Sequence, residues 1–434
     1  MKRVTCVLRF LGFFALLDPT ASAQRVTYER EPIHYADAEV NDRVAVLADQ
    51  VLSGEVTLEF DERFGYLKSV LDALEVSIAS QTLVFSKTSL QLHRISPRRP
   101  RALYFNDDVY VGYCQHGDVL EFAATDPKQG ATFYTLSQDE SEQPLFVRDK
   151  GGCLSCHASN RTQGVPGYLV RSVFADAAGR PKLGSGTFLT DHTSEFRNRW
   201  GGWYVSGSHG TMRHMGNSIS TEEEHLFDRD SGANDLDLRD NFRTENYLTA
   251  HSDLVALMVL EHQTQMHNAI AAANYETRLA LHQSYQMNEL LDRPQGHVSD
   301  IAKRRISSSA DRVLRYLLFC DEFQLSDRVS GTTDFALEFS ARGIRDAQGR
   351  SLRDFELESR MFRYPCSYLI HSEAFAALPD AVRRLVLTRL RAILDGNDDS
   401  GDFAHLVPKT RHAIREILED TLPEFKPVTL ARRD

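Results

Sequence analysis

Long apolar runs and an excess of positive charge are both lacking in this sequence of 434 residues. Beyond the N-terminal segment, no stretch contains eighteen uninterrupted apolar residues, which argues against a membrane-spanning helix. Asp and Glu (61) outnumber Lys and Arg (50), so the net charge is −11. Such an acidic chain does not favour nucleic acids or anionic membranes as partners. Internal repeats and low-complexity tracts are also absent.

Cysteine is scarce, with six residues, and the spacing C-x-x-C occurs once. Without a second such pair, the common four-cysteine zinc sites are disfavoured. Away from the pair, Cys320 and Cys366 could form a disulfide in an oxidising compartment and leave Cys114 buried or free. Sequence alone does not decide whether Cys320 and Cys366 are paired.

The single C-x-x-C lies in the stretch Gly151-Gly-Cys-Leu-Ser-Cys-His157. Two cysteines separated by two residues and followed by a histidine form the attachment motif of a c-type haem. One helical turn lets both thiols reach the vinyl groups on one edge of the porphyrin, and His157 can serve as the proximal iron ligand. We therefore predict one haem c, covalently bound through Cys153 and Cys156. A thioredoxin-like redox pair and half of a zinc site remain alternatives.

At Cys153, Cys156 and His157 the chain resembles the c-type cytochromes. The resemblance implies covalent haem, export before maturation and one-electron chemistry. Two further phrases, at 199–205 and 362–368, are similar to those of large secreted single-haem proteins without a known role, and they imply no function of their own.

Residues 1–23 are predicted to form a secretory signal peptide. Lys2 and Arg3 precede a mostly apolar run, and Ala21-Ser-Ala23 matches the small-residue cleavage pattern. An uncleaved anchor is the alternative. Because the resemblance implies that haem is attached outside the bacterial cytoplasm, we expect the protein in the periplasm.

The pattern predicts an α+β protein. Five short β-like runs between 82 and 136, separated by turn formers, predict an antiparallel meander, and 168–190 predicts a hairpin. Helical periodicity then predicts four helices, which cover 252–291, 302–323, 380–394 and 409–422.

This order divides the chain into three predicted parts after the signal peptide. Residues 24–217 are predicted to form a mixed α/β haem-binding domain, 218–245 an acidic linker, and 246–434 a mainly α-helical domain. A β-containing haem domain departs from the small all-helical fold that the resemblance to ordinary cytochromes c implies. Arg98, Arg99 and Arg101 form a basic cluster that either pairs with haem propionates or is solvated.

The sixth iron ligand decides the chemistry, because methionine suits electron transfer, histidine lowers the potential, and an open position allows ligands to react. The glycine-rich stretch 200–217 holds both tryptophans and the distal candidates, in order of preference Met215, then His214 and His209, with Met212 behind them. The alternative is that these residues only line a pocket or the surface. Met258, His262 and Met266, spaced four apart, are a rival set, although such residues on an apolar helix more often belong to a core.

The function predicted from these features is one-electron transfer by a periplasmic c-type cytochrome to a redox partner protein. The alternatives are a haem-dependent oxidoreductase of the peroxidase type and a haem-based sensor of redox state or gas. A di-haem peroxidase is excluded, because it needs a second C-x-x-C-H. The length exceeds that of a simple carrier, so the helical domain would provide a docking surface.

Overall fold

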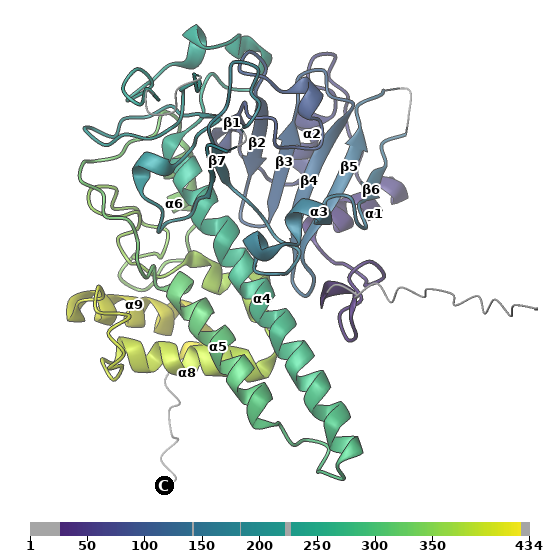
Figure 1. Ribbon diagram of the computed structural model, residues 1–434, viewed down its shortest axis with the longest axis vertical. Helices are drawn as coiled ribbons and strands as arrows, with labels where there is room; N and C mark the ends of the chain where they lie inside the picture. Colours follow the sequence, from purple (N-terminus) through teal and green to yellow (C-terminus); the bar gives the residue numbers. More distant parts are fainter. Residues whose placement is uncertain (1–26, 141–142, 183, 222–226, 427–434) are drawn as a thin grey trace, which may run out of the picture.

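A computed structural model describes residues 27–140, 143–182, 184–221 and 227–426. The chain combines an antiparallel seven-stranded sheet with a group of long helices (Figure 1), which confirms the predicted α+β class. The predicted signal peptide, residues 1–23, lies outside the described residues. Within the described ranges, no helix is both long and apolar enough to span a bilayer.

The sheet has the strand order β6-β5-β4-β3-β2-β1-β9, so β1 to β6 follow one another as a meander. Its strands are β1 (Thr82–Val84), β2 (Arg101–Phe105), β3 (Val109–Tyr113), β4 (Val119–Asp126), β5 (Gly130–Ser137), β6 (Phe146–Arg148) and β9 (Trp203–Tyr204). Register pairs Leu103 with Gly112 and Gly112 with Glu121. The predicted meander is therefore confirmed, and so is the hairpin, which consists of β7 (Arg171–Val173) and β8 (Thr187–Leu189).

One face of the sheet is covered by α1 (Arg43–Ser53) and α2 (Leu67–Ala73), whose apolar side chains form a core with Tyr104, Val111 and Phe122. The N-cap of α1 is Asp42, whose carboxylate accepts hydrogen bonds from the Val44 and Ala45 amides. The same carboxylate accepts hydrogen bonds from Thr132 and Tyr134 of β5. Asp42 thus joins the start of this helix to the sheet.

The second half of the chain is helical, as predicted. It contains α4 (Leu254–Leu290), α5 (Asp300–Leu317), α6 (Phe335–Ala341), α7 (Glu373–Ala376), α8 (Asp380–Leu394) and α9 (Pro408–Thr421). Asp253 caps α4 by accepting hydrogen bonds from the Val255 and Ala256 amides. Figure 1 shows α4 running from beside the sheet into the group of helices, where α5 packs along it.

Two side chains from the described part of the acidic stretch 218–245 pack into the fold. Leu238 is completely buried, and Phe242 stacks near Tyr204 of β9 at a centroid distance of 4.9 Å. A second core extends from Phe133 in the sheet, through α4, to Leu390 in α8. The sheet and the helices therefore share buried contacts.

Cys320 and Cys366 are both buried and unpaired, as is Cys114. The disulfide considered from the sequence is thus not formed in this structure. Burial raises the pKa of the Cys320 thiol to about 12, so it is protonated at neutral pH.

Candidate haem-attachment site

The C-x-x-C-H motif forms the short helix α3 (Leu154–His157), which begins after a turn held by Asp149. The Asp149 carboxylate accepts hydrogen bonds from the amides of Gly151, Gly152 and Cys153, the last at 2.7 Å. Partial burial raises the pKa of Asp149, but these amide hydrogen bonds outweigh it and lower the pKa below its usual value. A charged Asp149 therefore fixes the turn that presents the first cysteine.

The two motif cysteines are unpaired and lie about one helical turn apart, Cys153 partly exposed and Cys156 exposed. Burial, followed by the negative charge of Asp149, raises the pKa of Cys153 to about 12. This thiol is therefore protonated at neutral pH, whereas a redox-active C-x-x-C pair depends on a low-pKa thiolate. The described ranges also contain no group of three or more His, Cys, Asp or Glu side chains placed to hold a metal ion. The geometry thus favours neither the thiol-redox nor the zinc alternative.

The ring of His157 is oriented by a backbone carbonyl. Its Nδ1 donates a hydrogen bond to Gly167 O at 2.9 Å, and the Gly167 amide donates to His157 O at 2.8 Å. Burial lowers the pKa of His157, which favours the neutral imidazole. Because the Nδ1 proton is used in this bond, the neutral ring carries its lone pair on Nε2, the arrangement required of an iron ligand.

The support of His157 continues to α4. Asn268 Oδ1 accepts a hydrogen bond from the Tyr168 amide at 2.8 Å, and its Nδ2 donates to Tyr168 O at 2.9 Å. The Tyr168 hydroxyl lies 2.7 Å from Thr125 Oγ1. A Cβ at position 167 would overlap the Asn268 side chain, so the close approach of loop and helix requires glycine there.

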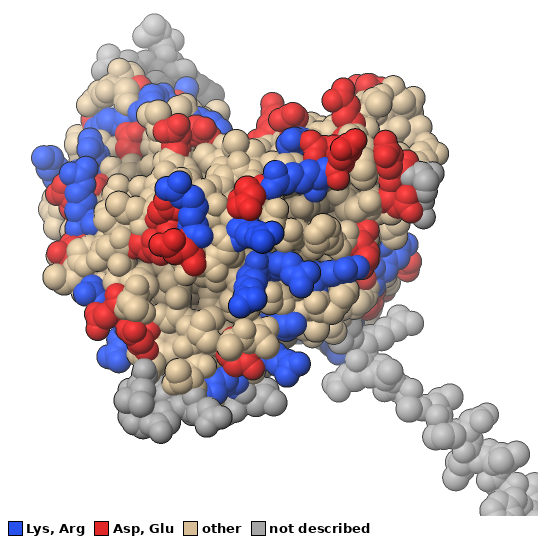
Figure 2. Space-filling view, turned by 90° about the horizontal axis from the view of Figure 1, so that it is seen from above, with Lys and Arg blue, Asp and Glu red and all other residues tan. Residues whose placement is uncertain are grey.

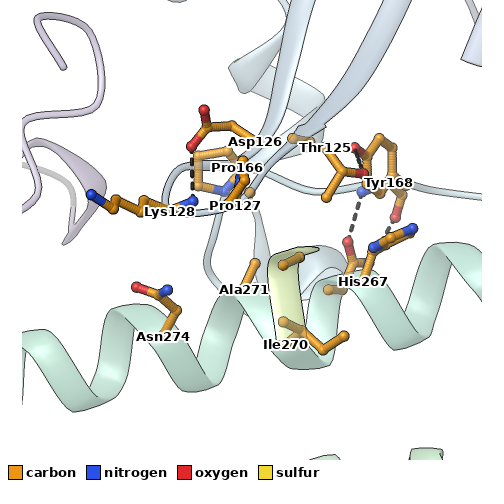
Figure 3. A pocket seen from close by; sticks show the side chains of 14 residues that line it. Thr125, Asp126, Pro127, Lys128, Pro166, Tyr168, His267, Ile270, Ala271 and Asn274 are labelled. Atoms are coloured by element: carbon orange, nitrogen blue, oxygen red, sulfur yellow. Dashed lines mark hydrogen bonds between the residues drawn. The ribbon is translucent and has the colours of Figure 1, made fainter. Parts of the chain in front are cut away.

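A cavity of about 10 Å³ lies behind this loop, between the β4–β5 turn, Pro166 and α4 (Figure 3). His267, Ile270, Ala271 and Asn274 line it from the helix, and Tyr168 lies at its edge. A single water needs roughly 10–15 Å³ of such space. This cavity is therefore a packing gap behind the loop and is too small for a substrate.

The sheet face next to His157 is partly exposed and mostly apolar. The Phe133 ring packs against the His157 ring with centroids 4.9 Å apart, and Leu103 and Ala123 are partly buried on the same face. Arg101 and Glu121 form an ion pair at 2.6 Å. Glycine at position 112 leaves room for the Arg101 side chain, which a Cβ there would overlap.

These features fit a covalently bound haem. The two unpaired thiols and the Nε2 of His157 supply the attachment atoms and a nitrogen donor, and the apolar sheet face suits contact with a porphyrin ring. Arg101 and Glu121 also act on His157, since Arg101 lowers its pKa and Glu121 raises it. Of the basic cluster 98–101, Arg101 is thus the member that lies near the histidine, paired with a carboxylate.

The distal candidates are held inside the fold. His209 Nδ1 donates to Met212 O at 2.8 Å, and its Nε2 accepts from the Asn234 amide at 3.0 Å, so both nitrogens are engaged. His214 is buried beside Trp200, and its Nδ1 accepts from the Gly216 amide at 3.0 Å.

Met215 is fully buried, and its sulfur lies 3.7 Å from the Ser172 hydroxyl of β7. Its neighbours are Phe174 and Phe227.

The rival set on α4 belongs to the core. His262 Nδ1 lies 3.1 Å from His192 Nδ1, and its Nε2 lies 2.8 Å from the Ser367 hydroxyl. Met258 and Met266 are buried in the second core.

The supporting residues Asp149, Gly167 and Asn268 were not predicted from the sequence. The Pro166-Gly167 turn close after the motif was the available local signal, whereas nothing near position 268 indicates its contact with the loop. Comparisons with protein-family models, curated proteins and solved structures find no match for this chain.

Proposed function

We propose that the protein is an exported c-type cytochrome that carries one haem and transfers one electron at a time. The observation that carries this proposal is the His157 Nδ1–H···O=C Gly167 hydrogen bond, which leaves Nε2 available beside two unpaired thiols one helical turn apart. When bound, haem c supplies the ferric–ferrous couple.

Each residue of the motif has a separate role in the proposal. Cys153 and Cys156 form the thioethers, and His157 binds the iron through Nε2. Asp149 holds the turn before Cys153 through its three amide contacts. Since Cys156 is exposed, the attached haem edge would lie near the surface, which suits exchange of electrons with a redox partner protein.

A specific observation favours a second candidate, a haem oxidoreductase or sensor with an open sixth position. His209 has both ring nitrogens engaged, and Met215 is fully buried with its sulfur 3.7 Å from the Ser172 hydroxyl. An iron that lacks a distal protein ligand binds small molecules.

Mass spectrometry of the protein, exported from a host that attaches c-type haem, tests the proposal. We expect a chain that begins at Gln24 and carries one covalent haem. The C153S/C156S variant should lose the covalent haem, whereas C320A, which removes a buried thiol outside the motif, should retain it. Wild-type protein without covalent haem would reject the proposal.

Carbon monoxide separates the two functions. A ferrous protein that keeps a low-spin spectrum and does not bind carbon monoxide supports electron transfer with six ligands. Rapid binding supports the open-site candidate. Loss of a methionine-to-iron charge-transfer band in Met215→Ala would identify Met215 as the distal ligand, and an unchanged band would reject it.

A further inference from the structure

A cleft of about 670 Å³ lies at the end of the sheet where β2 begins and β3 ends. Its walls come from the turn before β2, the loop after β3 and the segment 239–246. A volume of roughly 300–1,000 Å³ is typical of a site for a small organic molecule. The cleft is therefore large enough for a ligand, unlike the small cavity behind the loop that supports His157.

The cleft is separate from the candidate haem site. Phe242, which lines the cleft, belongs to the core that α1 and α2 form with one face of the sheet. Phe133, which packs against His157, belongs to the second core. The two sites therefore rest on different cores, and the ligand of the cleft is independent of the haem.

The turn that carries Arg98 and Arg99 is held at both ends. The Tyr204 hydroxyl donates a hydrogen bond to the backbone carbonyl that precedes Arg98, at 2.8 Å. The Tyr247 hydroxyl donates to the carbonyl that follows Arg99, at 2.7 Å. Both tyrosines are buried. Because the backbone of the turn is fixed, a ligand needs to order only the arginine side chains.

The segment 239–246 is fixed by the same two tyrosines. Phe242 packs against Tyr204 and Tyr247, with ring centroids 4.9 and 5.3 Å apart. The next residue, Arg243, lines the cleft. The arginines of the turn and of this segment therefore belong to two walls that one pair of tyrosines holds together.

Three arginines of the cleft are available to a ligand. Arg239 is engaged with Asp237 through two hydrogen bonds of its Nε, at 2.7 and 2.9 Å. Arg98, Arg99 and Arg243 are exposed, and their side chains have no hydrogen bond or ion pair with the described residues. Guanidinium groups bind carboxylates and phosphates in a bidentate manner. The cleft therefore suits an anionic group.

This group of unpaired arginines contrasts with the charge of the whole chain, which is −11. Figure 2, which views the molecule from above, shows basic side chains gathered in a band with acidic ones toward its margins. Neighbouring positive charges without a partner repel one another, and a bound anion offsets this repulsion. The arginines alone thus favour an anion, of whatever shape.

The rest of the lining favours an anion that also carries hydroxyl groups. Asp240 and Glu245 are exposed carboxylates, which repel an anion but accept hydrogen bonds from hydroxyls. Gln115 and Asn246 add side-chain amides, which donate hydrogen bonds to hydroxyl oxygens. A plain inorganic anion would match only the arginines, whereas a hydroxylated organic anion matches the whole lining.

We propose that the cleft binds a sugar that carries a phosphate or a carboxylate group. Arg98, Arg99 and Arg243 bind the anionic group. Asp240 and Glu245 accept hydrogen bonds from the sugar hydroxyls. Phosphate and carboxylate each present a pair of oxygens to a guanidinium, so the two sources share one binding chemistry.

Calorimetric titration of the purified protein tests the proposal. Glucose 6-phosphate and glucuronate supply the two anionic groups, while glucose and inorganic phosphate each supply one half of the ligand alone. We expect one of the sugar anions to bind at least about tenfold more tightly than either half, and that anion identifies the charged group. Equal binding of inorganic phosphate would overturn the proposal, and so would the absence of binding by both sugar anions.

Variants of exposed residues separate the roles within the cleft. R98A/R99A/R243A should weaken binding about a hundredfold, whereas R304A, which removes an exposed arginine of α5, should bind like wild type. R98K/R99K keeps the charge but loses the bidentate contact, so it should also bind more weakly. Glu245→Ala should weaken binding of the sugar anion while leaving inorganic phosphate bound at least as well. A Glu245→Ala protein that binds the sugar anion more tightly would show that the hydroxyl contact does not exist.

Discussion

The orientation of the His157 ring depends on Asn268, a side chain 100 residues beyond the Tyr168 backbone that it contacts. Asn268→Ala removes both hydrogen bonds to Tyr168 and leaves a buried amide and a buried carbonyl without their partner. Each unpaired group costs about 1–3 kcal/mol. We expect a less stable protein and, because the loop that carries Gly167 O is released, a shifted midpoint potential of the proposed haem.

The potential separates this positioning role from a general loss of stability. Asn268→Asp keeps the acceptor for the Tyr168 amide, so it should recover part of the wild-type potential. Asn288, which is buried on the same helix and donates to the carbonyls of Pro294 and His297, provides the matched control. Asn288→Ala should lower stability without moving the potential. A potential unchanged by Asn268→Ala would contradict the role.

Gly167 is the second residue in this support. Gly167→Ala places a methyl group against the Asn268 side chain, so one of them must move. We expect destabilisation of about 1–3 kcal/mol, as in other overpacked sites. In the double variant with Asn268→Ala the overlap with Asn268 disappears and only a tight approach of 3.0 Å to Thr162 Cβ remains, so the two losses should not fully add. Urea unfolding of the four proteins in the cycle measures the coupling, and simple additivity would show that the overlap is not the cause.

At the scale of elements, α4 has an unusual centre, because consecutive polar residues from Glu261 to Gln265 are buried. Glu261 pairs with Arg199 at 3.1 Å, both nearly inaccessible to solvent. Glu261→Ala leaves the buried guanidinium without its carboxylate, a change that costs about 3–5 kcal/mol. Replacing both residues by methionine should cost less, because no buried charge remains. Thermal unfolding of the single and double variants tests this, and a double variant less stable than Glu261→Ala would contradict it.

The elements themselves were largely predictable, because their signals are local. Asp253 and the long apolar pattern located α4, and turn residues such as Asn106-Asp107 separated the strands of the meander. The motif likewise located α3. The environment of Met215 was not predictable, because the β7 register that turns it toward Ser172 is a long-range property. The burial of Leu238 was not predictable either, because the surrounding sequence is acidic and resembles a solvated segment.

For the whole molecule, the buried histidines dominate the predicted pH dependence of stability. Outside the candidate haem site, burial lowers the pKa of four histidines. The pKa falls to about 4 for His192, His267 and His371. The pKa of His262 is also lowered well below its usual value. The unfolded chain binds protons at these positions below its usual pKa of about 6.5, whereas the folded chain does not. Their stabilisation is therefore complete above pH 6.5 and is lost as the pH falls toward 4.

Three carboxyl groups oppose this trend, and burial raises the pKa of one of them, Asp108, to about 6. Burial raises the pKa of both Glu261 and Glu322 to about 7, so between about pH 4.5 and 7 the folded chain binds more protons at these sites than the unfolded chain. Burial also lowers the pKa of His209 and His214, so the histidines that take up a proton on unfolding outnumber the carboxyl groups that release one. Each proton taken up contributes about 1.4 kcal/mol per pH unit. We therefore expect the free energy of unfolding to fall as the pH drops from 6.5 to 4.5. Glu261→Gln removes one opposing group and should steepen this decline, while Glu289→Gln, an exposed change on the same helix, should not. Denaturant unfolding at several pH values measures the slope, and a free energy that stays constant or rises toward pH 4.5 would show that the histidines are not held neutral by burial.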